Sequence, residues 1–227
     1  MIPVRDTIKT HRKPVVNYIL IGINVVVFLW MFLNSGRIDQ IYDQYALVPA
    51  SFSNGINLKS IMNIFTSMFM HGGWMHLISN MLYLWIFGDN IEDRLGSGLY
   101  IAFYLLGGVA AAGLQILINP SSTIPMVGAS GAIAAVLGAY LVLYPTSRVY
   151  TFIPLGFFAR LTLVPAVLVL GMWFVLQLIN GVGSLGIADS GGTAYFAHIG
   201  GFLFGLLIGY LSKKRTPDPQ PAPPMWS

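Results

Sequence analysis

The chain has 227 residues, of which 56% are hydrophobic and only 9% are charged, and its mean hydropathy is +0.71. Soluble domains carry about 25% charged residues, so this composition excludes an ordinary soluble domain and predicts an integral membrane protein. The absence of cysteine excludes disulfides, thiolate chemistry and cysteine metal sites. The net charge of +4 fits Lys and Arg in cytoplasmic loops better than nucleic-acid binding, so no nucleic-acid partner is expected.

The first apolar run, Val15–Leu33, contains no charged residue and is long enough to cross a bilayer, which takes about 20 apolar residues. A signal peptide is the alternative, because basic residues precede the run. The run is long for a signal peptide and no small-x-small cleavage site follows it, so we interpret it as a retained helix. Residues 34–63 mix charged and aromatic side chains, which fits either a partly submerged interfacial segment or an ordinary outer loop.

Five further apolar runs predict five more membrane helices, so the fold class is an all-α membrane bundle of six transmembrane helices. The second helix lies within residues 64–87 and begins at Gly73 or Trp74. The others are predicted within residues 99–118, 124–144, 161–179 and 194–211, with a short turn at 88–98 and a loop at 145–160. The resulting six-helix unit, residues 15–212, follows a cytoplasmic segment at 1–14 and precedes a proline-rich tail at 213–227, which is expected to be disordered.

The distribution of Lys and Arg predicts how the helices cross the membrane. An even number of helices puts both termini on one side. If that side is the cytoplasm, ten of the twelve basic residues lie inside, because only Arg37 and Lys59 fall in outer segments. The positive-inside rule favours this arrangement. It predicts a multi-pass protein of the cell inner (plasma) membrane with both termini in the cytoplasm.

Four polar side chains on three helices are predicted to meet in one layer of the membrane: His76, Asn80, Ser130 and His198. The second, fourth and sixth helices run from outside to inside, and each of the four residues lies early in its helix. At 1.5 Å per residue they lie roughly 5–15 Å below the outer surface. Intramembrane polar groups are costly and usually functional. His71 lies either off the face shared by His76 and Asn80 or before the helix, so we interpret it as a structural hydrogen-bonding residue.

Small residues predict that the fourth and sixth helices approach closely. Gly201, Gly205 and Gly209 form a stripe on the sixth helix, and the fourth carries a matching small-residue surface at Gly131, Ala134, Ala135 and Gly138. Such packing would bring His198 within reach of Ser130. The simpler interpretation, that these glycines serve packing alone, is fully compatible with this arrangement.

The residue types favour a Ser–His dyad, because serine becomes a strong nucleophile only beside a general base. None of the eight acidic residues falls inside an apolar run, so no embedded carboxylate can complete a triad. His76, Asn80 and the backbone N–H of Ser130 could donate to an oxyanion, while Gly128 and Gly131 leave room for a substrate carbonyl. The soluble-hydrolase motif Gly-x-Ser-x-Gly is excluded by Ala132, and neither a His-Glu-x-x-His nor a P-loop motif occurs.

Over residues 1–212 the sequence resembles the rhomboid family of intramembrane serine proteases, in its bacterial six-helix form. The motifs that carry the resemblance are Gly128-Ala129-Ser130-Gly131, Ala197-His198-Ile199-Gly200-Gly201, His71-x4-His76-x3-Asn80, Gly88-x3-Glu92-x3-Gly96 and Ile2-Pro3-x2-Asp6. Two places depart from relatives: Met62-Asn63 stands where some carry Trp-Arg, and Ala134 where some carry a tyrosine stacked on the histidine.

The resemblance implies a protease that cleaves single-span transmembrane substrates near their outer end, within the lipid bilayer, without metal or cofactor. It implies Ser130 as nucleophile, His198 as base, and His76 and Asn80 around the oxyanion. It also implies a submerged first loop and a mobile region, made of the fifth helix and residues 180–193, through which the substrate enters.

Two other classes compete with a protease. One is an inactive rhomboid-like binding protein, although such relatives usually lack the serine or the histidine. The other is a transporter, which should show inverted repeats or broken helices around a midplane site, whereas the polar residues here lie off-centre. The pattern specifies no physiological substrate and leaves the oligomeric state unknown.

Overall fold

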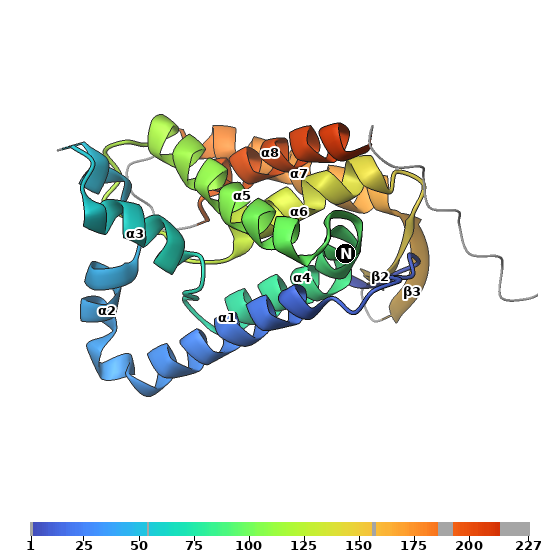
Figure 1. The fold of residues 1–227 in the computed structure, drawn as a ribbon, viewed down its shortest axis with the longest axis horizontal. Coiled ribbons are helices and arrows are strands. Elements are labelled where there is room, and N and C mark those ends of the chain that lie inside the picture. The colour runs from blue at the N-terminus through green and yellow to red at the C-terminus, as the bar shows by residue number, and fades with distance from the viewer. Residues whose placement is uncertain (1, 54, 156–157, 186–192, 214–227) are drawn as a thin grey trace, which may run out of the picture.

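The computed structural model describes residues 2–53, 55–155, 158–185 and 193–213 (Figure 1). The helices in these ranges are α1 (Val15–Leu33), α2 (Ile38–Tyr45), α3 (Leu58–Ser67), α4 (Trp74–Leu95), α5 (Ser97–Ile118), α6 (Ser130–Leu143), α7 (Ala166–Ser184) and α8 (Tyr195–Lys213), with short 3-10 helices at Ser35–Arg37 and Pro49–Phe52. The strands are β1 (Ile2–Asp6), β2 (Arg148–Leu155) and β3 (Phe158–Pro165). Of the predicted tail, only Lys213 lies within the described residues.

The prediction of a helical membrane bundle is confirmed. Among the described residues, four helices are long and apolar enough to cross a bilayer: α1, α5, α7 and α8. The apolar helix α6 has 14 residues and is therefore about 21 Å long. Helix α4 has 22 residues, but its last two turns carry charged side chains. The number of six crossings thus remains a prediction.

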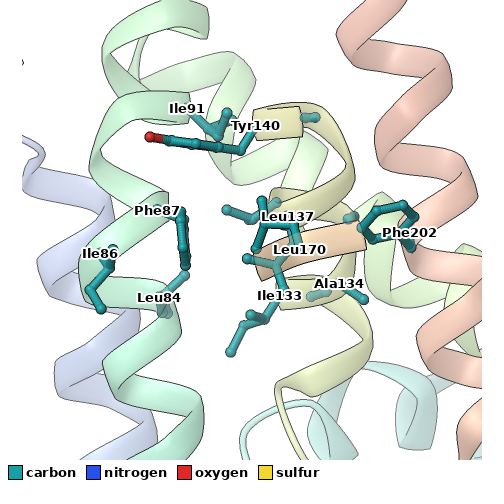
Figure 2. Packing of buried hydrophobic residues seen from close by; sticks show 14 of the residues in the cluster. Leu84, Ile86, Phe87, Ile91, Ile133, Ala134, Leu137, Tyr140, Leu170 and Phe202 are labelled. Carbon is teal, nitrogen blue, oxygen red and sulfur yellow. The ribbon is translucent and has the colours of Figure 1, made fainter. Parts of the chain in front are cut away.

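Helix α6 forms the centre of the bundle. All but three of its 14 residues are buried, because it is apolar on every side and is packed against α4, α5, α7 and α8. Figure 2 shows Phe87 and Ile91 of α4 facing the α6 side chains Leu137 and Tyr140, with Phe202 of α8 on the opposite side of α6. The first residue of this enclosed helix is Ser130.

Helices α6 and α8 pack with their backbones in contact, as the glycine stripe predicts. A Cβ atom on Gly201 would collide with the carbonyl oxygen of Gly131, and one on Gly205 would collide with that of Ala135. On the α6 side, a Cβ on Gly138 would collide with the carbonyl oxygen of Phe202. Only glycine allows this separation, so the stripe sets the distance between the two helices.

The first loop folds into α2, a 3-10 turn and α3, at the end of the bundle opposite the sheet (Figure 1). Asn63, in one of the two positions that depart from relatives, donates from Nδ2 to the carbonyl oxygen of Ala46 at 2.9 Å. Thr66 donates to the carbonyl oxygen of Tyr45 at 2.7 Å. These two bonds connect α3 to the end of α2 without the Trp-Arg pair.

Two segments expected to be irregular form a three-stranded antiparallel sheet, so the prediction of a loop at 145–160 is wrong. Strand β2 pairs with both β1 and β3, with the order β1-β2-β3. Strand β3 continues to Pro165, and α7 therefore begins at Ala166 rather than at residue 161. The apolar side chains of Leu161, Leu163 and Val164, which suggest a helix in the sequence, belong to a strand paired with β2.

The predicted turn at 88–98 is also wrong, because α4 continues to Leu95 and the chain turns only at Gly96, where φ is +78°. The Glu92 carboxylate accepts hydrogen bonds from the backbone N–H groups of Val16 and Asn17 at the start of α1, at 3.0 and 2.7 Å. Gly88 is helical, and a Cβ there would collide with the side chain of Asn17. The charges and the glycine therefore serve helix contacts.

Asp6 is the buried acidic group of the N-terminal strand. Its Oδ2 accepts hydrogen bonds from Tyr140 Oη at 2.6 Å and Asn90 Nδ2 at 2.9 Å, which joins β1 to α6 and α4. Burial raises the pKa of Asp6 to about 6, although these hydrogen bonds and the nearby Arg5 oppose the shift. The neutral carboxylic acid is thus favoured more in the folded protein than in the unfolded chain.

We expect Asp6→Asn to flatten the pH dependence of stability. Because the folded-state pKa is raised, the stabilising contribution of Asp6 is complete below pH 3.8 and is lost as the pH rises through about 6. Relative to the variant, the wild type should lose about 1 kcal/mol between about pH 5 and about pH 7.5. The measurement is the thermal midpoint in one detergent across that range. The exposed Asp39→Asn is the control, and parallel curves for Asp6→Asn and wild type would contradict the prediction.

We expect Gly205→Ala to force α6 and α8 apart, because the new methyl group would meet the carbonyl oxygen of Ala135. Overpacking of this kind costs about 1–3 kcal/mol of unfolding free energy. Gly113→Ala on α5 is the matched control, since a Cβ there meets no atom within 4 Å. Thermal midpoints of the two variants in the same detergent should differ clearly. Equal thermal midpoints would show that the close approach of Gly205 to Ala135 does not limit how α6 and α8 pack.

Candidate active site

Ser130 and His198 are brought into direct contact by the packing of α6 on α8. The distance between Ser130 Oγ and His198 Nε2 is 2.7 Å. Ser130 is the first residue of α6, so its backbone N–H has no partner within the helix. His198 lies in the first turns of α8 and is only 8% exposed. The arrangement places a hydroxyl proton between an oxygen and a basic nitrogen.

Backbone hydrogen bonds to two other parts of the chain hold the segment before Ser130 in place. Met126 and Leu47 exchange two backbone hydrogen bonds of 2.7 and 3.2 Å, and the N–H of Gly128 donates to the carbonyl oxygen of Ser67 at 2.9 Å. Gly128 has a φ of +130°, which favours glycine. Its missing side chain also leaves space for His76, whose Nε2 lies 2.7 Å from where a Cβ would be.

His76 and Asn80 of α4 point toward the same place. Asn80 Nδ2 lies 3.7 Å from the position of a Cβ on Gly128. Asn80 is 7% exposed, and its Nδ2 has no hydrogen-bond partner among the described residues. A buried N–H donor without a partner is costly, so this group is available to an acceptor that enters the site.

His71 and Gly131 lie close to the site and have packing contacts. The ring of His71 is 1% exposed and meets that of His76 edge-on, with ring centroids 5.0 Å apart. Neither ring nitrogen of His71 has a hydrogen-bond partner among the described residues, so the predicted structural hydrogen bond is not found. A Cβ on Gly131 would lie 2.6 Å from Ala111 Cβ. The absence of a side chain at Gly131 therefore lets α5 pack closely against α6, in addition to α8. Neither residue lines the cavity described next.

A cavity of about 1220 Å³ opens beside the four polar side chains Ser130, His198, His76 and Asn80, which all line it. Its wall also includes the loop residues 121, 122 and 124–127 and neutral polar side chains such as Gln115. Gln115 Oε1 accepts the backbone N–H of Ala197 at 3.1 Å, next to His198. The cavity is large enough for a peptide segment to reach the Ser130 hydroxyl.

Sequence reasoning missed two residues of α7 that contact His198. Gln177 Oε1 lies 2.8 Å from His198 Nδ1, and the Trp173 ring lies 5.6 Å from the His198 ring at an angle of 35°. The available signal was a lone amide in the apolar run 161–179, four residues after a tryptophan and therefore on the same helical face. Ala134, where some relatives have a tyrosine, is fully buried, and Trp173 packs near the histidine instead.

The chemistry of the arrangement is that of a base-activated hydroxyl. Within the described residues, the hydrogen-bond partners of the His198 ring are Ser130 and Gln177, and both are neutral. The hydroxyl faces the cavity together with the donors His76 and Asn80. In this geometry the hydroxyl oxygen can add to a carbonyl carbon, and nearby N–H donors can stabilise the negative charge that forms on the carbonyl oxygen.

Comparisons with known proteins agree with this geometry. A family model described as the rhomboid domain matches residues 58–215. Rhomboid protein 1, mitochondrial, from Saccharomyces cerevisiae is 32% identical over 213 residues, covering 90% of this chain and 55% of that protein. The rhomboid protease GlpG of Salmonella typhi is 28% identical over 223 residues, covering 94% and 70%. The rhomboid protease GluP of Bacillus subtilis is 27% identical over 176 residues, covering 78% and 33%.

The chain thus spans about half the length of the yeast relative and about a third of GluP. The matched domain nevertheless takes in well over half of this chain and contains the second, fourth and sixth predicted helices with their polar residues. Because the match to the rhomboid domain covers residues 58–215, the chain belongs to the rhomboid family.

Proposed function

We propose that this protein is an intramembrane serine endopeptidase, with Ser130 as nucleophile and His198 as general base. The observation that carries the proposal is the 2.7 Å hydrogen bond between Ser130 Oγ and His198 Nε2 at the wall of the cavity. A serine hydroxyl needs a base to become an effective nucleophile, and imidazole suits that role near neutral pH. The relatives GlpG and GluP are described as rhomboid proteases, which supports the same activity here.

In the proposed reaction, Ser130 Oγ attacks the carbonyl carbon of the scissile peptide while His198 Nε2 takes the hydroxyl proton. The carbonyl electron pair moves to oxygen and then returns, which breaks the C–N bond as His198 delivers the proton to the leaving amine. An acyl ester on Ser130 remains. Water then attacks this ester with His198 again as base, which releases the acid product and restores the hydroxyl. These steps require neither metal nor cofactor.

The oxyanion is proposed to be stabilised by His76, Asn80 and the backbone N–H of Ser130. The support is the unpartnered Nδ2 of Asn80 and the approach of both side chains to Gly128, two residues before the nucleophile. Donors that are already oriented stabilise developing charge without reorganisation. Gly128, Gly131, Gly201 and Gly205 would act indirectly, because they let the chain segments that carry these groups approach one another.

The proposed substrates are single-span membrane proteins that are cut near the outer end of their transmembrane segment. The support is the position of Ser130, at the end of α6 that faces away from the sheet. The sheet and the charged end of α4 lie at the other end of the bundle (Figure 1). A hydrophobic segment that enters between lipid-facing helices would meet the cavity in the outer layer of the bilayer.

The proposed location is the cell inner (plasma) membrane, with residues 15–212 as the catalytic unit and both termini in the cytoplasm. The support is the charge asymmetry of ten basic residues to two. Arg5 and Arg148 lie in β1 and β2 at the sheet end, whereas Arg37 lies beside α2 at the opposite end. The fold thus separates the basic groups in space as the proposed orientation requires.

Ser130→Ala and His198→Ala are each expected to abolish cleavage without unfolding the protein. The double variant should be no less active than either single variant, because the two residues act as a unit. The measurement is cleavage of a panel of single-span substrates in proteoliposomes, with the thermal midpoint as folding control. Fluorophosphonate labelling of Ser130 should also require His198. Cleavage that survives in Ser130→Ala would contradict the proposal.

Asn80→Ala should lower kcat with little change in KM if Asn80 donates to the oxyanion. Loss of one donor costs roughly 3–4 kcal/mol in a soluble protease, and we expect less here because His76 and the Ser130 N–H remain. His71→Ala is the comparison, and it should act mainly by lowering the thermal midpoint. If Asn80→Ala lowers the midpoint while folded protein keeps its turnover, the residue is an interhelical packing group instead.

A reporter that is active only in the cytoplasm, fused after Ser227, should be active, because the charge asymmetry keeps that terminus inside. A reporter that is active only outside the cytoplasm should be silent at the same position. The matched pair inserted near Lys59 should give the reverse result. An active external reporter after Ser227 would overturn the orientation.

A further inference from the structure

We infer that Gln177 of α7 is a neutral third member of the catalytic group, which holds His198 in the one tautomer that can act as the base. This inference rests on the proposed function and adds a positioning residue to it. Gln177 Oε1 lies 2.8 Å from His198 Nδ1, on the opposite edge of the ring from Ser130. Gln177 does not line the cavity, so it acts through the histidine rather than on a substrate.

The orientation of the Gln177 amide follows from its second hydrogen bond. Its Nε2 donates to the carbonyl oxygen of Trp173, one turn earlier in α7, at 3.3 Å. A carbonyl oxygen can only accept, so the nitrogen of the amide must face Trp173 and the oxygen must face His198. The side chain is only 9% exposed, which limits competition from water for either bond.

The amide oxygen determines which ring nitrogen carries the proton. An acceptor beside Nδ1 requires the hydrogen on Nδ1, because a neutral imidazole has one donor and one acceptor. The lone pair is then on Nε2, which is the atom 2.7 Å from Ser130 Oγ. Without Gln177, the tautomer with hydrogen on Nε2 becomes accessible, and that form cannot take the serine proton.

The same helix also restrains the plane of the ring. Trp173 lies 5.6 Å from the His198 ring, while Ala134 on α6 offers no ring on its side. Helix α7 therefore supplies both the edge contact and the face contact. A neutral amide avoids the cost of an additional charge inside the membrane, which a carboxylate at this position would carry.

The experiment compares Gln177→Leu and Gln177→Glu with wild type in proteoliposomes. Gln177→Leu removes the acceptor, and kcat should fall at least about tenfold with little change in KM. Gln177→Glu restores an acceptor and should recover most of kcat. Its carboxylate also stabilises the protonated imidazole, so the acidic limb of the pH profile should move to higher pH. Asn24→Leu on α1 is the control, because it removes a buried amide that bonds to Leu20 of its own helix and does not line the cavity, so kcat should stay unchanged.

Nitrogen NMR of the histidine rings gives a readout that does not depend on cleavage. His198 in wild type should be protonated on Nδ1, and Gln177→Leu should show both tautomers. If wild type cleaves and Gln177→Leu keeps its kcat and its tautomer, the inference is wrong while the function stands. If Gln177→Leu loses kcat but Gln177→Glu does not recover it and the tautomer is unchanged, the residue is a packing group. If wild type cleaves nothing, the function fails and the tautomer alone decides the inference.

Discussion

The contact between the backbones of α6 and α8 is the constraint on which the rest of the structure depends. Ser130 begins one helix and His198 lies in the first turns of the other, so their separation is set by the distance between the helix axes. Gly201 and Gly205 allow that distance by leaving the carbonyl oxygens of α6 uncovered. These glycines contribute no side-chain contact. Because they have no Cβ atom, α8 can approach α6 closely enough for His198 to reach Ser130.

Enclosure of α6 has a second consequence, which concerns how the histidine is supported. With α4, α5 and α8 packed closely around α6, residue 134 is fully buried against Gly201 and is an alanine. The ring and hydrogen-bond support for His198 then come from α7, which contributes Trp173 and Gln177. Helix α7 therefore both supports His198 and forms part of the cavity wall, because Trp173 also lines the cavity.

The buried carboxylates of the fold and the Asn80 amide beside the cavity differ in their hydrogen bonding. At the sheet end, carboxylates are buried with several donors each: Glu92 accepts the first N–H groups of α1, and Asp6 connects β1 to α4 and α6. At the opposite end, the groups around the cavity are neutral, and at least one donor, on Asn80, has no protein partner among the described residues. Satisfied polar groups stabilise the fold, whereas an unsatisfied donor is available for a reaction.

The sequence by itself determined the helical membrane bundle, the glycine contact and the identity of the paired serine and histidine, because hydropathy, small-residue spacing and rare embedded polar groups are local signals. It misassigned residues 88–95 as a turn, although their charged residues and glycine belong to a helix and contact α1. It also misassigned residues 148–165 as a loop and the start of a helix, although they form paired strands. Only the tertiary structure decided the sheet and the roles of Gln177 and Trp173. Strand pairing and the orientation of an amide depend on partners far away in the chain, which no local pattern records.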